Sequence, residues 1–334
     1  MEEAREKVAA FLGCRTAEVF FTSGGSEAVN WAVKGSVLAH PPRFRPIVTG
    51  VLEHESMVAA VAQMEGWGCS VHRLGCDGLG RYRWEELESA PVDACVASFQ
   101  LGNSETGTLQ DLAAPAAWCE THAVPMHVDA IQAAGRVPID ATALGADLLS
   151  IAGHKFGAPK GVGALVIRGR AKPAPLISGG GQERGLRAGT ENLPGIVGLG
   201  VAAEETRRML TTRIAALTRL TDLLWRRMVE AIPDAQRNGD PTHALPGVLS
   251  LALPGCDAET LVAALDLSGL AISAGPACSS GALVPSRVLS AMGLPPQRVR
   301  ASIRLAVSQD TTPAMLDRLV AELKTAVDRQ RGIV

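Results

Sequence analysis

Residues 147–163 read Asp-Leu-Leu-Ser-Ile-Ala-Gly-His-Lys-Phe-Gly-Ala-Pro-Lys-Gly-Val-Gly, and this stretch decides how the rest of the chain is interpreted. The apolar run at 148–151 predicts a buried strand, and Lys155 follows shortly after its end. Most lysines lie on solvated helix faces. Gly153 and Gly157 instead allow the backbone to pass close to a ligand, and apolar neighbours would lower the pKa of the ammonium. Because a Schiff-base lysine needs such a pKa, the stretch predicts that Lys155 holds an aldehyde cofactor.

The length and composition indicate a globular enzyme of two domains. The chain has 334 residues, of which 47% are hydrophobic and 20% are charged. A chain of this length can bury a substantial core in each of two domains. We place a large cofactor-binding domain at residues 1–205 and a smaller C-terminal domain at residues 206–334.

Several classes of protein are disfavoured. The formal net charge of −2 gives no basic surface for nucleic acid, and no apolar run is long enough to span a membrane. The charged N-terminal segment resembles neither a signal peptide nor a transit peptide. Seven scattered cysteines without CxxC spacing predict a reducing compartment, with neither a disulfide framework nor a metal site. The expected location is the cytoplasm.

Alternating strand and helix patterns predict an α/β fold with a mostly parallel sheet. The helices expected in the large domain are 2–12, 26–39, one of about a dozen residues from 55, 83–89 and 112–122. A long helix at 193–231 is expected to span from one domain to the next. The expected strands are 19–22, 46–49, 70–74, 93–99, 125–132, 148–151 and 163–167.

Ligands of such folds bind at the carboxyl ends of the strands. Five polar clusters lie at such ends or in the turns beyond, namely Ser23–Ser26, His54, Asn103–Glu105, Asp129–Gln132 and His154–Lys155. Each cluster alone has a structural alternative. Ser26 could simply cap a helix, and a histidine at a helix cap is more often structural than catalytic. Their common placement favours a binding site.

The loop at 178–192 and the C-terminal domain add further candidates. Arg184, Arg187 and Thr190 are ligand-type groups that a flexible linker would not need. Cys278 lies among small residues at 273–282, whereas most cysteines are small core residues. Arg304 lies inside an apolar strand, so it is expected to face a carboxylate. The expected C-terminal strands are 248–253, 270–272 and 301–306, and the expected helices are 258–266, 286–292 and 312–329.

Together these residues match the requirements of pyridoxal phosphate (PLP). Lys155 would bind the aldehyde, and Asp129 would keep the pyridinium nitrogen protonated. His54 would cover the ring face, and Gln132 would donate to the phenolate oxygen. Arg304 would bind the carboxylate of an amino-acid substrate. The phosphate would be held at a helix N-terminus by Gly25, Ser26, His154 and Thr190.

The ordered motifs resemble those of the cysteine desulfurases, class V of the fold-type I PLP enzymes. The resemblance rests on Thr22-Ser23-Gly24-Gly25-Ser26-Glu27, Glu53-His54, His-Val-Asp-Ala-x-Gln at 127–132, Gly153-His154-Lys155, Gly179-Gly180-Gly181-Gln182-Glu183-Arg184 and Arg187-Ala188-Gly189-Thr190. Ala277-Cys278-Ser279-Ser280-Gly281, Pro285-Ser286 and Ser302-Ile303-Arg304 are similar to the NifS/IscS-like group. The resemblance covers nearly the whole chain and implies a seven-stranded, mostly parallel sheet with a smaller α+β domain.

The resemblance implies conversion of L-cysteine to L-alanine, with the sulfur left on Cys278 as a persulfide. Lys155 would remove the Cα proton, and His54 would stack on the ring and move protons. Asn103 and Ser104 would complete the substrate and cofactor contacts. Thr190 would reach the cofactor phosphate of a partner subunit, which implies a homodimer. A sulfur-acceptor protein, such as an iron–sulfur scaffold or a thiolation protein, would take the sulfur.

Three departures from the family pattern stand out. Ser104 replaces an asparagine that helps to hold the cofactor ring oxygen, and Ala152 replaces a serine before Gly-His-Lys. Family chains also begin a few dozen residues earlier, with a cofactor-proximal Asp-Asn-Ala segment that this sequence is expected to lack. The alternatives are another class V enzyme, such as a selenocysteine lyase or an aminotransferase, and a catalytically weak PLP-binding scaffold.

Overall fold

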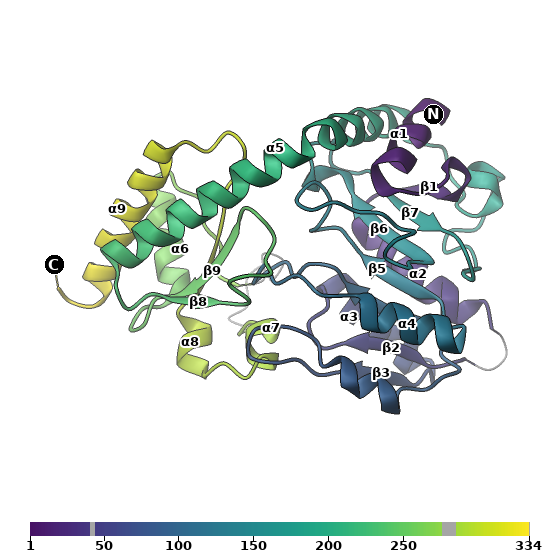
Figure 1. Cartoon of the computed structure of the whole chain (residues 1–334), viewed down its shortest axis with the longest axis horizontal. Helices are drawn as coiled ribbons and strands as arrows, with labels where there is room; N and C mark the ends of the chain where they lie inside the picture. The colour runs from purple at the N-terminus through teal and green to yellow at the C-terminus, as the bar shows by residue number, and fades with distance from the viewer. Residues whose placement is uncertain (41–43, 276–284, 334) are drawn as a thin grey trace. The chain divides into compact units, whose positions relative to one another are not determined.

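A computed structural model describes residues 1–40, 44–275 and 285–333, which form two compact units (Figure 1). The large unit comprises Met1–Gly75, Tyr82–Gly102 and Gln110–Leu210. The small unit comprises Cys76–Arg81, Asn103–Leu109 and Thr211–Val334. Each unit has its own sheet. Among the described residues, no helix has both the length and the apolar character that crossing a membrane requires.

The large unit is built on a seven-stranded sheet with the order β1-β7-β6-β5-β4-β2-β3. Only β7 runs against the others, because it pairs antiparallel with both β1 and β6 while the remaining pairs are parallel. The predicted mostly parallel sheet is confirmed. The strands are β1 (Val19–Thr22), β2 (Ile47–Gly50), β3 (Val71–Leu74), β4 (Val96–Gln100), β5 (Met126–Asp129), β6 (Leu148–Ala152) and β7 (Gly163–Ile167).

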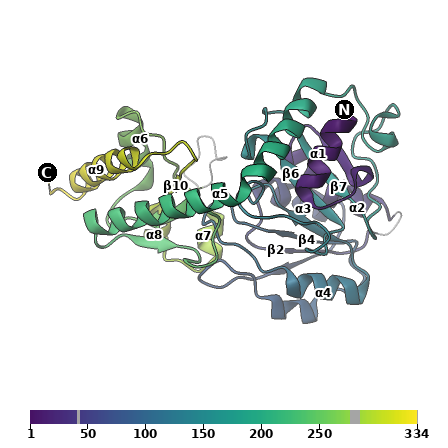
Figure 2. The same ribbon diagram turned by 45° about the horizontal axis from the view of Figure 1, so that its top comes forward.

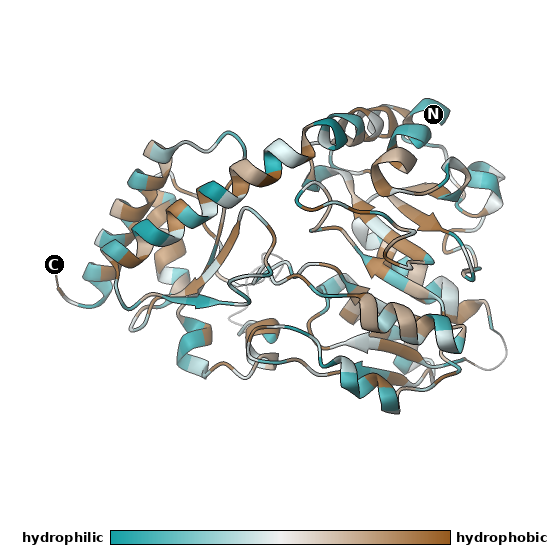
Figure 3. Ribbon diagram, in the orientation of Figure 1, coloured by the Kyte–Doolittle hydropathy of each residue, from teal (hydrophilic) through white to brown (hydrophobic). Residues whose placement is uncertain are grey.

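Helices connect these strands and bury their apolar faces against the sheet. Trp31 of α2 and Met57 of α3 belong to one buried cluster with Ile47, Leu148 and Leu165 from the strands. Figure 3 shows the strands of this sheet mainly in the hydrophobic colour. The segment expected as a helix at 83–89 is a 3₁₀ helix. The elements are α1 (Glu2–Leu12), η1 (Thr16–Glu18), α2 (Gly25–Leu38), α3 (Glu55–Gly66), η2 (Trp84–Ser89), α4 (Ala113–His122), η3 (Gly153–Lys155), η4 (Gln182–Gly185) and the first part of α5 (Leu193–Ala231).

The small unit has a three-stranded antiparallel sheet with the order β10-β9-β8. Its core joins Leu224 of α5, Leu251 of β9, Leu261 of α6 and Leu323 of α9. Helices α6 and α9 lie side by side in both views (Figures 1 and 2). The elements are β8 (Gln236–Asn238), β9 (Val248–Ala252), α6 (Ala258–Leu267), α7 (Arg287–Ala291), α8 (Pro296–Arg300), β10 (Ser302–Ala306) and α9 (Pro313–Gln330).

One predicted strand of the small unit is wrong. Residues 270–272 form no strand, and the chain only makes an isolated bridge between Ser273 and Arg304. Gly269 has a φ of 71°, so the chain turns immediately before the apolar run. One bridge does not develop into a ladder, although the composition of the run is strand-like.

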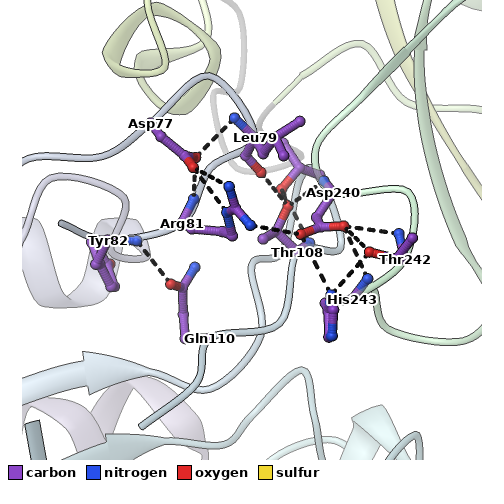
Figure 4. A network of polar contacts seen from close by, with 10 residues as sticks. Asp77, Leu79, Arg81, Tyr82, Thr108, Gln110, Asp240, Thr242 and His243 are labelled. Atoms are coloured by element: carbon purple, nitrogen blue, oxygen red, sulfur yellow. Dashed lines mark hydrogen bonds and ion pairs between the residues drawn. The ribbon is translucent and has the colours of Figure 1, made fainter. Parts of the chain in front are cut away.

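A polar network explains why two short segments belong to the small unit (Figure 4). Asp77 accepts hydrogen bonds from the N–H groups of Leu79 and Arg81, both at 2.9 Å. The Thr108 hydroxyl donates to the Leu79 carbonyl at 2.8 Å and accepts from the Asp240 N–H at 3.0 Å. The segments at 76–81 and 103–109 are therefore fixed to the loop that follows β8.

Candidate active site

Three strand ends of the large unit meet at the start of α2. A Cβ atom added to Gly25 would lie 2.4 Å from Ile131 Cδ1 and 3.2 Å from Ala152 Cβ. Only glycine allows so close an approach. The helix N-terminus that follows β1 thus packs directly on the turn after β5 and on the end of β6. The structure brings together three of the five polar clusters that the sequence singled out.

Lys155 is the last residue of η3, the short turn that follows β6. The Gly153 N–H donates to the Val162 carbonyl at 3.0 Å, and the Ala158 N–H donates to the Gly153 carbonyl at 3.0 Å. A side chain on Gly153 would lie 2.8 Å from Ala158 and 3.0 Å from Leu199. The turn is therefore closely packed beneath a half-buried lysine. A half-buried lysine on a closely packed turn suits covalent attachment of an aldehyde.

Asp129 ends β5 and is 5% exposed. Its Oδ1 accepts the Ile131 N–H at 2.9 Å. Burial raises the pKa of Asp129 to about 6, although that hydrogen bond and the positive charge of Lys155 both act in the opposite direction. A buried carboxylate with a raised pKa gains most from a further cationic partner, and a protonated pyridinium nitrogen is such a partner.

The Asp129 carboxyl predicts a specific dependence of stability on pH. Its pKa is higher in the folded protein than the ordinary 3.8, so the folded state binds more protons and the free energy of unfolding falls as pH rises from about 4 to about 6. Without cofactor, deprotonation of Asp129 should lower the free energy of unfolding by about 3 kcal/mol across that range. Asp129→Asn should remove the loss.

Urea unfolding of the cofactor-free wild-type protein and Asp129→Asn across this pH range measures the effect. Burial lowers the pKa of His127 to about 3, and this histidine is common to both proteins. The difference between the two pH profiles therefore isolates Asp129. Identical profiles would contradict the assigned shift.

His54 caps the N-terminus of α3. Its Nδ1 accepts the Ser56 N–H at 3.1 Å and lies 2.9 Å from the Ser56 hydroxyl. A neutral imidazole that accepts at Nδ1 carries its proton on Nε2. His54 therefore forms the helix cap that the structural reading expects, and the cap also fixes the orientation of the ring.

The buried hydrogen bonds of Glu53, the residue that precedes His54, were not predicted from the sequence. Glu53 is 1% exposed and accepts hydrogen bonds from the Tyr82 hydroxyl and from the Gln100 N–H. A Cβ atom on Gly50 would lie 2.1 Å from the Tyr82 ring, so this glycine makes room for the tyrosine. The sequence did show Glu53 as a carboxylate shortly after an apolar strand. Its partners could not be predicted, because Tyr82 and Gln100 are distant in sequence.

The remaining predicted cofactor ligands of the large unit differ in exposure. Ser26, His154 and Thr190 are exposed, and Gln132 is half-buried. Burial, followed by the positive charges of Lys155 and Lys160, lowers the pKa of His154. A neutral imidazole can still donate a hydrogen bond to a phosphate. This donor set, with the N-terminus of α2, suits an anion.

The loop at 178–192 is not a flexible linker, because both of its arginines make contacts with the large unit. Arg184 donates to the Val19 carbonyl at 2.7 Å, and its guanidinium lies 3.9 Å from the centre of the Phe20 ring. Arg187 forms an ion pair with Glu27 at 2.8 Å. Both arginines therefore fix the loop to the large unit.

The small unit contains the other predicted substrate groups. Asn103 is 1% exposed, and its Oδ1 accepts the N–H groups of Glu105 and Thr106 at 2.8 and 2.9 Å. Arg304 donates from Nη1 to the Ser104 carbonyl at 2.7 Å. Asn103 therefore shapes the turn, and Arg304 is tied to it. The predicted nucleophile, Cys278, lies outside the described residues.

Comparison with known proteins decides the family. The sequence profile of the family described as "Aminotransferase class-V" matches residues 1–314. The chain belongs to the class V aminotransferase family. A relative named "Cysteine desulfurase" from Trichormus azollae is 40% identical over 99% of this chain and 82% of its own length. "Cysteine desulfurase IscS" from Methanosarcina thermophila is 38% identical over the same shares.

Solved structures agree with this assignment. A structure titled "NIFS-LIKE PROTEIN" superposes on this chain with a TM-score of 0.91 at 31% sequence identity. The superposition covers 98% of this chain and 87% of the other chain. Within the class V family, this chain is a PLP-dependent cysteine desulfurase. The buried carboxylate, the packed lysine turn and the glycine-based helix N-terminus described above fit PLP.

Proposed function

We propose that Lys155, Asp129, His54 and Gln132 form the PLP site and that Cys278 receives the sulfur. The observation that carries the proposal is the convergence of the turns after β1, β5 and β6 around Gly25. When bound, PLP supplies an aldehyde for the substrate amine and a ring that accepts electron density from Cα. Lys155 removes the Cα proton, Asp129 stabilises a protonated ring nitrogen, and His54 covers the ring and moves protons.

The phosphate is held by Gly25, Ser26 and His154 at the N-terminus of α2. Helix N-termini favour anions because unpaired N–H groups and the helix dipole point toward them. Within the small unit, Arg304 binds the substrate carboxylate, beside the turn that Asn103 and Ser104 form.

Cys278 attacks the sulfur of the bound substrate as a thiolate. The new S–S bond forms as the Cβ–S bond of the substrate breaks, Cβ is protonated, and L-alanine leaves. The enzyme then carries a persulfide on Cys278. An acceptor protein, such as an iron–sulfur scaffold or a thiolation protein, takes this sulfur in the cytoplasm, without direct nucleic-acid or membrane binding.

A homodimer completes the proposal. Leu193, Val197 and Val201 of α5 are 51%, 48% and 50% exposed and recur at helical spacing on one face. This stripe begins three residues after Thr190, which we assign to the phosphate of the partner subunit. An exposed apolar stripe next to a ligand residue supports a subunit interface there.

A charged residue introduced into this apolar stripe tests whether the stripe forms the dimer interface. Val197→Asp should raise the dimer dissociation constant by at least about a hundredfold, because burying an unpaired carboxylate costs several kcal/mol. Light scattering coupled to gel filtration measures the molar mass of the protein in solution and so distinguishes dimer from monomer. Leu267→Asp, at a residue of the small unit that is 91% exposed, is the matched control and should leave the mass unchanged. A dimeric Val197→Asp protein would place the interface elsewhere.

The reaction is tested by product stoichiometry. Purified holoenzyme with L-cysteine and a thiol reductant should form L-alanine and sulfide in equal amounts. Formation of a keto acid would indicate an aminotransferase instead. Turnover of selenocysteine without turnover of cysteine would indicate a selenocysteine lyase. No product from either amino acid would favour the scaffold alternative.

A further inference from the structure

An ion pair joins the loop at 178–192 to the helix that we assign to the cofactor phosphate. Arg187 Nε lies 2.8 Å from Glu27 Oε1, and Arg187 Nη2 lies 3.1 Å from Glu27 Oε2. The pair is bidentate, and the two side chains are 19% and 10% exposed. Parallel hydrogen bonds of this kind are among the strongest between protein side chains.

Glu27 occupies an unusual place for a carboxylate in an anion site. It lies in the first turn of α2, and its Oε2 also accepts the Ser23 N–H at 2.7 Å. The carboxylate thus lies back over the turn between β1 and α2. Burial would raise the pKa of Glu27, but the hydrogen bonds from Arg187 and Ser23 lower it, so the group is charged. An uncompensated carboxylate at this point would repel a phosphate dianion.

A second ion pair holds the segment that carries Arg187. Glu183 accepts from Arg5 Nη1 at 2.8 Å and Nη2 at 2.9 Å, and from the Phe21 N–H at 2.9 Å. The side chains of Arg5 and Glu183 are 5% and 2% exposed.

The backbone around Glu183 is strained. Glu183 and Arg184 have φ values of 46° and 59°, a conformation that non-glycine residues rarely adopt. Such strain persists where surrounding contacts over-determine it, and it is concentrated at functional sites. The buried pair therefore fixes the path of the chain that presents Arg187 to Glu27.

We infer that Arg187 is a positioning residue for phosphate binding, because it neutralises Glu27 at the N-terminus of α2 and keeps that carboxylate folded onto the Ser23 N–H. The inference rests on the proposed PLP site, and it adds a role for Glu27 and Arg187, to which we assign no direct contact with the cofactor. Its consequence is selective: Arg187 should affect affinity for the phosphate ester and not for the ring.

The experiment titrates cofactor-free, full-length protein with PLP and with pyridoxal, which lacks the phosphate. Arg187→Met should weaken PLP binding by about tenfold and leave pyridoxal binding within about twofold. Arg187→Lys should retain most of the affinity, because it keeps the charge. The double variant Glu27→Gln/Arg187→Met should recover to within about threefold of wild type, because the repelling carboxylate is gone.

Three results would overturn the inference. The first is equal loss of PLP and pyridoxal affinity in Arg187→Met, which would indicate general damage. The second is a double variant as weak as Arg187→Met, and the third is unchanged PLP binding in Arg187→Met. Wild-type protein that binds no PLP would instead overturn the proposed function, and the inference with it.

Discussion

Replacing Lys155 with alanine should abolish L-alanine formation from L-cysteine and remove the visible absorbance of the bound cofactor. The turn at the end of β6 carries the half-buried Lys155, whose positive charge acts on the buried carboxyl of Asp129. This amine has two tasks in our account, holding the aldehyde and moving the Cα proton. Loss of a positioned acid–base group alone typically costs about 10²–10⁴-fold in rate, so we expect at least about a hundredfold loss.

Lys160 provides the matched control. It is an exposed lysine in the same segment, five positions further along the chain. Lys160→Ala should keep both the absorbance and the rate. Visible absorbance that survives in Lys155→Ala would mean that a different amine holds the cofactor, and the assigned site would be wrong.

Replacing Cys278 with serine should stop sulfide release while leaving the cofactor absorbance intact. A hydroxyl cannot accept the substrate sulfur at neutral pH, so the loss should be about a thousandfold or more, as for other essential nucleophiles. The double variant Lys155→Ala/Cys278→Ser should be no slower than the slower single variant, because residues that act as one unit are not additive. The rate of sulfide release in the presence of reductant measures the activity of the single and the double variants.

Five of the six described cysteines make poor substitutes for Cys278. Burial raises the pKa of Cys14, Cys95 and Cys119 to about 12, and it also raises the pKa of Cys69 and Cys256. A thiol with such a pKa is almost entirely protonated at neutral pH and reacts slowly. Cys14 is the one that is only half-buried, so Cys14→Ser is the control and should retain activity. Full sulfide release by Cys278→Ser would contradict the account.

The fold was predictable where the chain follows simple periodic patterns. Helix α5 was predicted at its observed bounds, and the β–α alternation indicated the parallel sheet. The small unit was harder. Strand β8, Gln236–Asn238, is polar and lies at a sheet edge, so it has no apolar pattern. Its Asn238 side chain donates to the hydroxyls of Ser250 and Ser302.

The site was predictable only in part. Polar residues at strand ends can be found from the sequence because strand ends are recognisable. The groups that hold them could not be found, because their partners are far apart: Arg5 and Glu183 are 178 positions apart, and Glu27 and Arg187 are 160 apart. A sequence pattern marks Arg187 as a polar group in a glycine-rich loop. Only the folded chain shows that its partner is a carboxylate.

The most direct test of the central claim is the fate of the sulfur atom. Holoenzyme is incubated with L-cysteine in the absence of acceptor and reductant, alkylated, digested and analysed by mass spectrometry. We predict one additional sulfur atom on the peptide that contains Cys278, and none when Lys155→Ala is treated in the same way. Additional sulfur on another cysteine, or L-alanine formed without a persulfide on Cys278, would contradict the account.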